Sequence, residues 1–493
     1  MRAERSQLEV AIIGAGLSGI GMAAHMRMLC PQLSFTLLER RDSIGGTWDL
    51  FRYPGVRSDS DMHTLGFVFE PWVHEKSIAD GPAILEYLER ITRERGIAEH
   101  IRFGTTVQSA AFDSEAALWR IGVEDADGWH EVTARFLYLG SGYYDYDDPH
   151  DPQLPGLENF GGEVLHPQFW PRDLDYAGRR VVVIGSGATA VTMVPAMADE
   201  AAHVTMLQRT PTWMGSRPAT DAVANFLRRH LPEKLAYRLT RAKNIFLQDF
   251  FFKRARRKPE QVSEFLTKKA KEAMGAAYDP LHFTPPYNPW EQRLCLVPDD
   301  DFFHAVRDGK ASVATGHIAG FDADGVTLKS GEHLPADILV TATGLQLAMG
   351  GKIALSIDGA PLNQADHFFY RNCMLSNVPN LAMVFGYLNA SWTLRSDSVA
   401  EYVCRVLNAL DAKGADIVYP LLPDPDALEE DDIFDFSSGY LQRAKHLLPK
   451  SAPELPWRLN QDYRQDRRDY RARPIEDGIL RFEHAGALAE AAE

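Results

Sequence analysis

The chain of 493 residues is long enough for two or three domains with a well-buried core, and its formal net charge is -16. Such an acidic balance argues against general affinity for nucleic acid, because phosphate binding requires a basic surface. The four cysteines are far apart and form no CxxC pair, which argues against a disulfide framework, a metal site and an oxidising compartment. A charged N-terminal stretch, and no apolar run near the ~20 residues of a spanning helix, predict a cytoplasmic protein without a signal peptide.

The first predicted element is a short apolar strand, residues 8–13, that ends in a glycine-rich GxGxxG turn. A helical segment, residues 20–29, follows, which gives the strand–turn–helix context that dinucleotide binding requires. The next strand ends in Glu39, 20 residues beyond Gly19, where a carboxylate accepts hydrogen bonds from ribose hydroxyls and repels a 2′-phosphate. We therefore predict a site for a nucleotide with a free 2′-hydroxyl, formed by Gly14, Gly16, Leu17, Ser18 and Gly19.

The segment 45–61, GGTWDLFRYPGVRSDSD, is dense in glycine, proline, aromatic and charged residues, and this composition predicts a functional loop. An amphipathic helix over residues 83–96 and three short strands between residues 101 and 137 are predicted to complete this part of the chain. A crossover out of the first domain is expected near Ser141 and Gly142.

A second glycine turn follows a strand at residues 179–184, and the strand after it ends in Arg209. Arg209 lies 24 residues beyond Gly185, where a guanidinium can bind a 2′-phosphate bidentately. The alternative interpretation is a solvated surface charge. We expect this second site to prefer NADP, with the candidate residues Gly185, Ser186, Gly187, Ala188, Thr189, Ala190, Arg209 and Thr210.

The segment 221–272 differs from its surroundings because it is helical by periodicity and carries a net charge of +8, from 14 Lys and Arg against 6 Asp and Glu. Aromatic residues are interleaved with these charges. One interpretation is a helical insertion that covers the second domain with a solvated basic face. The other is a surface for an anionic membrane or a partner, and the sequence does not separate the two.

These elements predict an α/β fold with two Rossmann-like dinucleotide-binding domains. The first domain is expected over residues 1–144, and the second over residues 145–340 with a helical insertion at about 215–290. An apolar strand ending in Thr343 and Gly344 is expected to return the chain to the first domain, which then includes residues 341–493 and a C-terminal tail.

Two longer motifs resemble one known family, the flavin-dependent class B monooxygenases of the Baeyer–Villiger type. The segment 160–171 matches that family's fingerprint at Phe160, Gly162, His166, Trp170 and Pro171. The loop 45–61 matches its second signature, and residues 337–344 match a strand common to flavoproteins of this group. The likeness covers nearly the whole chain and extends to the ethionamide-activating members from mycobacteria.

The resemblance implies FAD at the first site, NADPH at the second and O2 as co-substrate. It implies an enzyme that forms a C4a-peroxyflavin and inserts oxygen into small-molecule ketones to give esters or lactones, and that also oxidises sulfides. The alternative is a flavin monooxygenase restricted to nitrogen and sulfur. A disulfide reductase would share both folds but needs a redox CxxC pair, and the intact motifs argue against a non-catalytic scaffold.

The resemblance also assigns roles to individual residues. A deprotonated oxidant needs a fixed cation, which by similarity is Arg293, with Asp59 orienting it. Gln292 replaces a lysine that many family members carry, which places more of the 2′-phosphate load on Arg209. Trp457 matches an aromatic that closes over NADP and substrate, and His166 is expected at a hinge rather than in proton transfer. The other implied cofactor residues are Arg40, Gly46, Thr47, Trp48, Tyr53, Val107, Thr343, Gly344 and Trp392.

Overall fold

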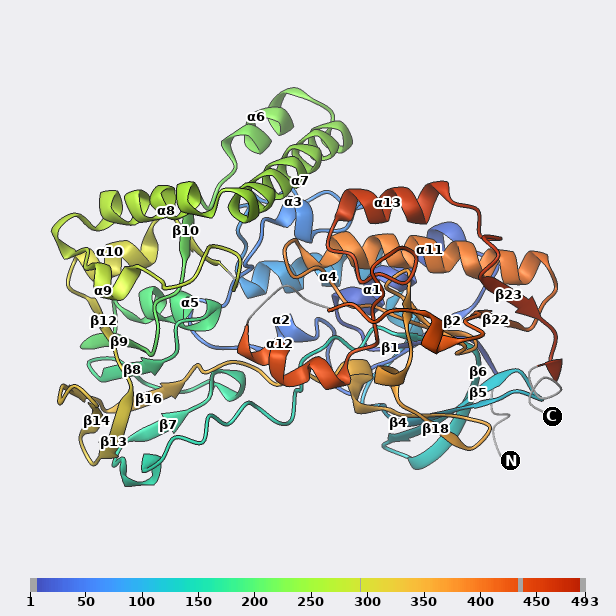
Figure 1. Ribbon diagram of the computed structural model, residues 1–493, viewed down its shortest axis with the longest axis horizontal. Coiled ribbons are helices and arrows are strands. Elements are labelled where there is room, and N and C mark those ends of the chain that lie inside the picture. The colour runs from blue at the N-terminus through green and yellow to red at the C-terminus, as the bar shows by residue number, and fades with distance from the viewer. Residues whose placement is uncertain (1–6, 293, 433–437, 488–493) are drawn as a thin grey trace.

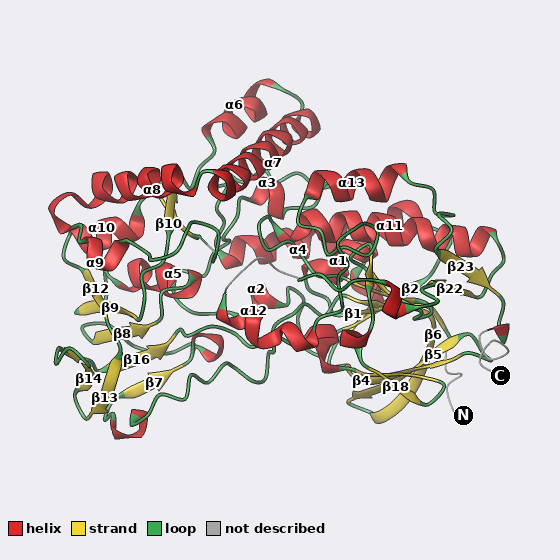
Figure 2. Ribbon diagram, in the orientation of Figure 1, coloured by secondary structure: helices red, strands yellow, loops and turns green. Residues whose placement is uncertain are grey.

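The computed structural model describes residues 7–292, 294–432 and 438–487, and its two main β-sheets are each packed against helices (Figures 1 and 2). The first sheet has nine strands in the order β18-β17-β4-β5-β6-β1-β2-β3, with β21 paired to β6. Strand β1 pairs in parallel with β2 and β6 and is buried along most of its length, as expected for a parallel strand covered on both faces. The strands are β1 (Leu8–Ile13), β2 (Phe35–Leu38), β3 (Ile101–Arg102), β4 (Thr106–Asp113), β5 (Leu118–Asp125), β6 (Gly128–Leu139), β17 (Ala354–Ile357), β18 (Ala360–Leu362) and β21 (Leu381–Met383).

Two long buried helices pack on each other beside this sheet, α1 (Leu17–Leu29) and α11 (Trp392–Ala412). Helix α4 (Gly81–Glu94) begins two residues before the predicted start at residue 83, because Asp80 caps it by accepting a hydrogen bond from the Ala83 amide at 2.9 Å. The remaining elements of this part are α2 (Thr47–Leu50), α3 (Met62–Leu65), α12 (Gly439–Ala444), α13 (Tyr463–Ala472), β19 (Phe369–Tyr370), β20 (Met374–Leu375), β22 (Ile417–Pro420) and β23 (Leu480–Glu483).

The second sheet has five parallel strands in the order β12-β9-β8-β16-β7. They are β7 (Glu163–Leu165), β8 (Arg180–Ile184), β9 (His203–Gln208), β12 (Ala311–Thr315) and β16 (Ile338–Thr341). Around this sheet lie α5 (Ala188–Met197), α10 (Asp301–Arg307), the parallel pair β10 (Met214–Arg217) and β11 (Cys295–Pro298), and the antiparallel strands β13 (Ile318–Asp322), β14 (Gly325–Leu328) and β15 (His333–Pro335). The two sheets confirm the predicted fold class, whereas the residue bounds of the domains stay predictions.

The predicted helical insertion consists of α6 (Ala222–His230), α7 (Glu233–Arg257), α8 (Pro259–Met274) and α9 (Pro280–Phe283). Helices α6 and α7 form a hairpin that stands out from the rest of the molecule (Figure 1). Helix α8 packs on α10 and β10, but α7 packs on α3. The insertion therefore joins the two parts of the molecule rather than covering the second alone. No helix within the described residues is both long and apolar enough to cross a membrane.

The chain passes between the two sheets twice, and the two passages run side by side. Tyr144 and Leu347 form an antiparallel bridge. The Asp145 amide donates to the Gln346 carbonyl at 2.9 Å, and the Ala348 amide donates to the Tyr143 carbonyl at 3.0 Å. A short ladder therefore ties the outgoing passage to the returning one.

Candidate functional site

A cavity of about 400 Å³ lies between the two glycine turns. The first turn contributes Gly14 and Gly16 to its wall, and helix α5 after the second turn contributes Ala188, Thr189 and Thr192. Residues from the loop 45–61 complete much of the wall. The first glycine turn and the helix that follows the second turn thus face one space.

The first turn can adopt its shape only with glycine at two positions. Gly14 has φ +94°, and a Cβ at Gly19 would lie 1.9 Å from the Gly14 carbonyl oxygen. At Gly16, by contrast, a Cβ would meet only the Gly46 backbone, at 3.6 Å and beyond, so the chain leaves room there for a ligand. Helix α1 starts at Leu17 without a side-chain cap, and its first amides are available to an anion.

The second turn repeats this geometry. Gly185 has φ +137°, and a Cβ there would lie 2.1 Å from the Ala342 carbonyl oxygen. Gly187 caps helix α5 without a side-chain bond, and a Cβ on it would have no neighbour within 4 Å. Each turn therefore presents uncapped helix amides beside an open glycine, which suits a pyrophosphate.

Glu39 is buried at the end of β2 and lines the cavity. Its carboxylate accepts hydrogen bonds from the Ala15 amide at 2.6 Å and the Arg41 amide at 2.9 Å. Burial raises the pKa of Glu39, and the two backbone donors oppose that rise. These bonds fix both oxygens in position to accept ribose hydroxyls.

An aromatic wall closes the cavity beside helix α1. The Trp392 indole stacks on Tyr143 with centroids 4.7 Å apart, and its Nε1 donates to Ser18 Oγ at 2.8 Å. Gly386 is required behind this indole, because a Cβ there would lie 2.2 Å from the ring. The wall is thus fixed to the glycine-turn helix itself.

The loop 45–61 reaches from the first sheet to helix α5. Burial raises the pKa of Tyr53 to about 12, and this hydroxyl hydrogen-bonds with Thr189 at the start of α5. A Cβ on Gly55 would lie 2.6 Å from the Ala196 side chain, so loop and helix are in close contact. The predicted functional loop therefore forms a wall shared by both nucleotide turns.

The predicted cation, Arg293, lies outside the described residues. Its neighbours Trp290 and Leu294 line the cavity, as do Asp59 and Arg57. Arg57 forms an ion pair with Asp301 of α10, which ties the loop to the second part of the molecule. Described residues on both sides of position 293 therefore lie at the cavity wall.

Several buried polar atoms at the cavity have no hydrogen-bond partner among the described residues. They are Ser60 Oγ, Ser141 Oγ, Gln248 Oε1, Trp290 Nε1 and Asn389 Oδ1. Unpaired buried polar groups are costly, so a set of them around one space indicates a polar ligand. Donors and acceptors interspersed with aromatic rings fit a dinucleotide with a planar ring system.

The predicted residues fall into two groups. Those lining the cavity are Gly14, Gly16, Leu17, Ser18, Glu39, Arg40, Gly46, Thr47, Trp48, Tyr53, Asp59, Val107, Ala188, Thr189 and Trp392. Those placed around it but outside its lining are Gly19, Gly185, Ser186, Gly187, Ala190, Arg209, Thr210, Thr343 and Gly344. Arg209 is exposed at the end of β9, where it forms no ion pair with another described residue.

Trp457 does not line the cavity, and its closure over bound NADP and substrate stays a prediction. The indole is 7% exposed and packs edge-on against Tyr370, with centroids 5.4 Å apart. The fold of the C-terminal tail determines this position of Trp457. The Arg371 amide donates a hydrogen bond to the Pro456 carbonyl at 2.7 Å and holds the segment in the hydrophobic core around α1 and α11.

The fingerprint lies beside the two passages between the sheets. Its residues 163–165 form the edge strand β7, and Gly162 has no space for a side chain because a Cβ would lie 2.3 Å from the Asp337 carbonyl oxygen. Phe160 and Trp170 are buried in two separate cores. The first half of the segment is therefore part of the sheet edge and not a free loop, and Pro171 at its end is exposed at the surface.

His166 faces the returning passage. Its Nδ1 accepts a hydrogen bond from the Gln168 amide at 3.2 Å, and burial lowers its pKa, partly opposed by the Gly344 backbone. Gln168 Nε2 donates to the Asp145 carbonyl at 2.8 Å and so holds the outgoing passage. The sequence motif does not single out Gln168, because it occupies one of the variable positions.

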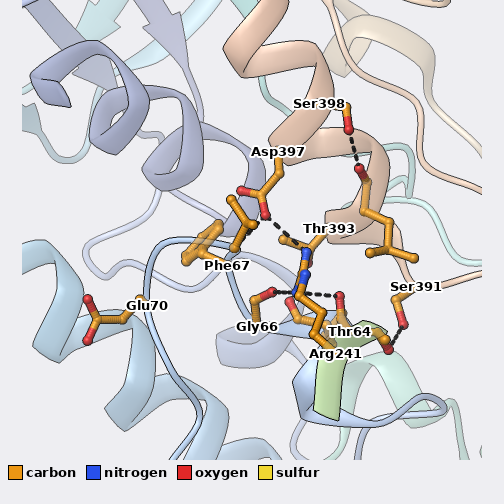
Figure 3. Close-up of polar contacts among 12 residues, drawn as sticks. Thr64, Gly66, Phe67, Glu70, Arg241, Ser391, Thr393, Asp397 and Ser398 are labelled. Carbon is orange, nitrogen blue, oxygen red and sulfur yellow. Dashed lines mark hydrogen bonds and ion pairs between the residues drawn. The ribbon is translucent and has the colours of Figure 1, made fainter. Parts of the chain in front are cut away.

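A buried arginine of the insertion completes the support of the cavity wall (Figure 3). Arg241 Nη1 donates to the carbonyls of His63 at 2.9 Å and Gly66 at 2.7 Å, at the end of α3. Its Nη2 lies 3.3 Å from Asp397 Oδ2 in α11. Arg241 therefore connects α7 to the helix that begins at Trp392, and periodicity alone gave no reason to separate it from the other basic residues of the insertion.

The comparisons with known proteins agree with this geometry. Residues 11–239 match the family model described as pyridine nucleotide-disulphide oxidoreductase. The chain is 47% identical over 477 residues to the FAD-containing monooxygenase EthA of Mycobacterium tuberculosis, which covers 96% of this chain and 97% of EthA.

Among solved structures, an oxidized steroid monooxygenase bound to NADP has a TM-score of 0.78 at 22% identity, covering 97% of this chain and 100% of that one. A cyclohexanone monooxygenase bound to ε-caprolactone has a TM-score of 0.72 at 22% identity, with coverage of 97% and 100%. At 22% identity these structural matches establish the fold alone, and this fold agrees with the predicted α/β class with two Rossmann-like domains.

Proposed function

Since this chain belongs to the family of FAD-containing monooxygenases, we propose that it is an NADPH-dependent Baeyer–Villiger monooxygenase. It binds FAD at the first turn and NADPH at the second, and it inserts one atom of O2 into ketones to give esters or lactones. Sulfides are a second class of substrate. The observation that carries this proposal is the single cavity that is lined by the first glycine turn and by the start of helix α5, which follows the second turn.

The first site is suited to FAD. The open backbone at Gly16 and the uncapped start of α1 accommodate the pyrophosphate. Glu39 accepts the ribose hydroxyls, and the unpaired polar atoms near Trp392 and Asn389 face the remaining space. Bound flavin would supply the activation of O2, which no amino-acid side chain provides.

The second site is suited to NADPH. The turn beginning at Gly185 holds the pyrophosphate, and the exposed Arg209 binds the 2′-phosphate bidentately. Tyr53 and Thr189 hold the start of α5 against the loop 45–61, so a coenzyme on this turn is directed into the shared cavity.

In this proposal the protein side chains orient the substrate and stabilise negative charge on the oxidant, and the cofactors supply the electrons. Arg293 is the cation of the site, because arginine stays protonated at working pH and attracts the anionic oxidant that ketone attack requires. Asp59 orients Arg293. The aromatic wall around Trp392 and Trp290 excludes water from this space.

The test is NADPH consumption with product analysis over linear, cyclic and aryl ketones and over sulfides. We expect esters or lactones from ketones and sulfoxides from sulfides. Arg293→Ala should abolish ketone oxidation while sulfide oxidation persists, whereas the exposed control Arg257→Ala should retain both. Ketone oxidation by Arg293→Ala at the wild-type rate would refute the role of Arg293, and turnover of sulfides and amines alone by the wild-type enzyme would assign it to nitrogen and sulfur oxygenation instead.

A further inference from the structure

Helix α7 has an apolar stripe on the face opposite to its buried one. The buried face includes Ala236, Thr240 and Asn244. On the opposite face, side chains at helical spacing project outward with about half of their surface exposed: Leu235 at 43%, Leu239 at 45%, Phe246 at 51% and Phe250 at 53%. An apolar stripe that is exposed to water along a helix indicates an interaction site, because contact between a continuous apolar surface and water is unfavourable.

Exposed apolar side chains are concentrated on this hairpin. Of the sixteen large apolar side chains exposed among the described residues, seven lie on α6 and α7, between Val223 and Phe250. Val223 and Phe226 are on α6, which packs on α7. The hairpin that carries them projects from the molecule as a ridge (Figure 1). A projecting hairpin can insert its side chains into a deformable surface such as a lipid bilayer. It offers little flat area for an interface with a second protein.

Basic side chains flank the stripe in an otherwise acidic chain. The segment 221–272 has a net charge of +8 within a total of -16. Among the described residues, Lys234 and Arg238 of α7 form no ion pair. Helix α13 lies next to α7, because Arg464 lies 5.5 Å from the centre of the Phe246 ring and Lys253 pairs with Asp462 at 3.0 Å.

Helix α13 extends the positive charge on the same side. Its exposed residues include Arg464, Arg467 and Arg468, while Asp466 and Asp469 of the same helix are buried. The acid groups of α13 are therefore turned inward and its guanidinium groups outward. The exposed sides of α6, α7 and α13 together form what we call the basic–apolar face.

We propose that the basic–apolar face binds the surface of an anionic lipid bilayer. The phenyl rings and leucines enter the boundary between headgroups and acyl chains, and the arginines and lysines remain among the anionic headgroups. The acidic remainder of the molecule is repelled by the same bilayer, so the protein is held in one orientation.

The test is sedimentation of the FAD-loaded protein with vesicles. Phosphatidylcholine vesicles containing phosphatidylglycerol should bind it at low salt, and both phosphatidylcholine alone and high salt should weaken binding. The variant Phe246→Ser/Phe250→Ser should lower the partition coefficient about a hundredfold, from roughly tenfold for each half-exposed ring removed. The variant Arg467→Glu/Arg468→Glu should weaken binding and remove most of its salt dependence.

The matched control is Trp129→Ser, which removes a side chain 62% exposed on β6, outside the basic–apolar face. It should bind vesicles like the wild type, and all variants should retain FAD and NADPH oxidation in solution. Absence of binding to phosphatidylglycerol vesicles, or equal loss in Trp129→Ser, would overturn the proposal. Concentration-dependent self-association without lipid, abolished by Phe246→Ser/Phe250→Ser, would also overturn it by assigning the face to a second copy.

Discussion

At the scale of single residues, Glu39 and Arg209 occupy the ends of two equivalent strands with opposite charge. Glu39 is buried and fixed by two backbone amides, whereas Arg209 is exposed and forms no ion pair within the described part of the chain. The carboxylate repels a 2′-phosphate and the guanidinium attracts one. We therefore expect one charge at each strand end to direct each nucleotide to its own turn.

Arg209→Ala should raise the NADPH KM far more than the NADH KM. Removing a charged, bidentate contact costs roughly 1.5–3 kcal/mol of phosphate binding, and NADH lacks that phosphate. Steady-state kinetics with both coenzymes measure the effect. Equal changes in the two KM values would show that Arg209 does not hold the phosphate.

His166 makes stability depend on pH in a defined direction. Burial lowers its pKa below the ordinary value of 6.5, so the unfolded chain takes up the proton more readily than the folded one. The stability that His166 contributes is complete above pH 6.5 and is lost as the pH falls from there through the lowered folded-state pKa.

The Tm of the wild-type protein should therefore fall more between about pH 7.5 and pH 5 than the Tm of His166→Gln, which cannot take up this proton. Calorimetry at several pH values gives the comparison, and the two proteins serve as each other's control because all other histidines are shared. Parallel pH profiles would contradict this origin of the pH dependence.

At the scale of elements, helix α7 is attached to α3 and α11 of the first part of the molecule through Arg241. Arg241 satisfies the carbonyls at the end of α3 and neutralises Asp397, and the Val68 amide donates to that same carboxylate at 2.7 Å. A one-turn helix such as α3 has no stability of its own, so its position depends on these bonds.

Arg241→Met should destabilise the protein by about 3–5 kcal/mol, because it leaves a carboxylate buried without its cation. Arg238→Met, on the exposed side of the same helix, should change stability by less than about 0.5 kcal/mol. Denaturant unfolding of both variants measures the difference. Similar midpoints for the two would show that the buried ion pair does not anchor α7.

Features set by local chain geometry were predictable from sequence, and features set by distant contacts were not. The glycine turns and Glu39 follow from spacing within about 25 residues of chain. Arg241 and Asp397 meet only after folding, at a separation of 156 residues, and nothing local distinguishes Arg241 from the exposed Arg238. The packing of Trp457 in the first core was not predictable, because the surrounding tail offers little motif spacing to align and the burial depends on the contact with residue 371.

At the scale of the whole molecule, the paired passages between the sheets are held by the fingerprint. Gln168 donates to the Asp145 carbonyl, and Asp145 in turn donates its amide to Gln346 of the returning passage. A side chain in the turn after the edge strand β7 thus holds both passages in register.

Gln168→Leu should accelerate hydrogen exchange at the amides of Asp145 and Ala348, by about tenfold for each 1.4 kcal/mol of stabilisation lost from the ladder. Amides inside β8 should be unaffected. Gln153→Leu, farther along the chain, is the matched control, because among the described residues Gln153 forms hydrogen bonds with nearby Asp151 and none with the returning passage. Unchanged exchange at residues 145 and 348 would remove Gln168 from this role.

The ladder between the two passages also constrains how the molecule can move. Two independent linkers would allow the sheets to twist, slide and separate in many ways. Because the two passages are hydrogen-bonded to each other at residues 143–145 and 346–348, we expect them to move together as one unit. The two connecting passages therefore act as a single hinge between the two sheets. We expect the cavity to open and close by rotation of one sheet and its helices relative to the other about this hinge.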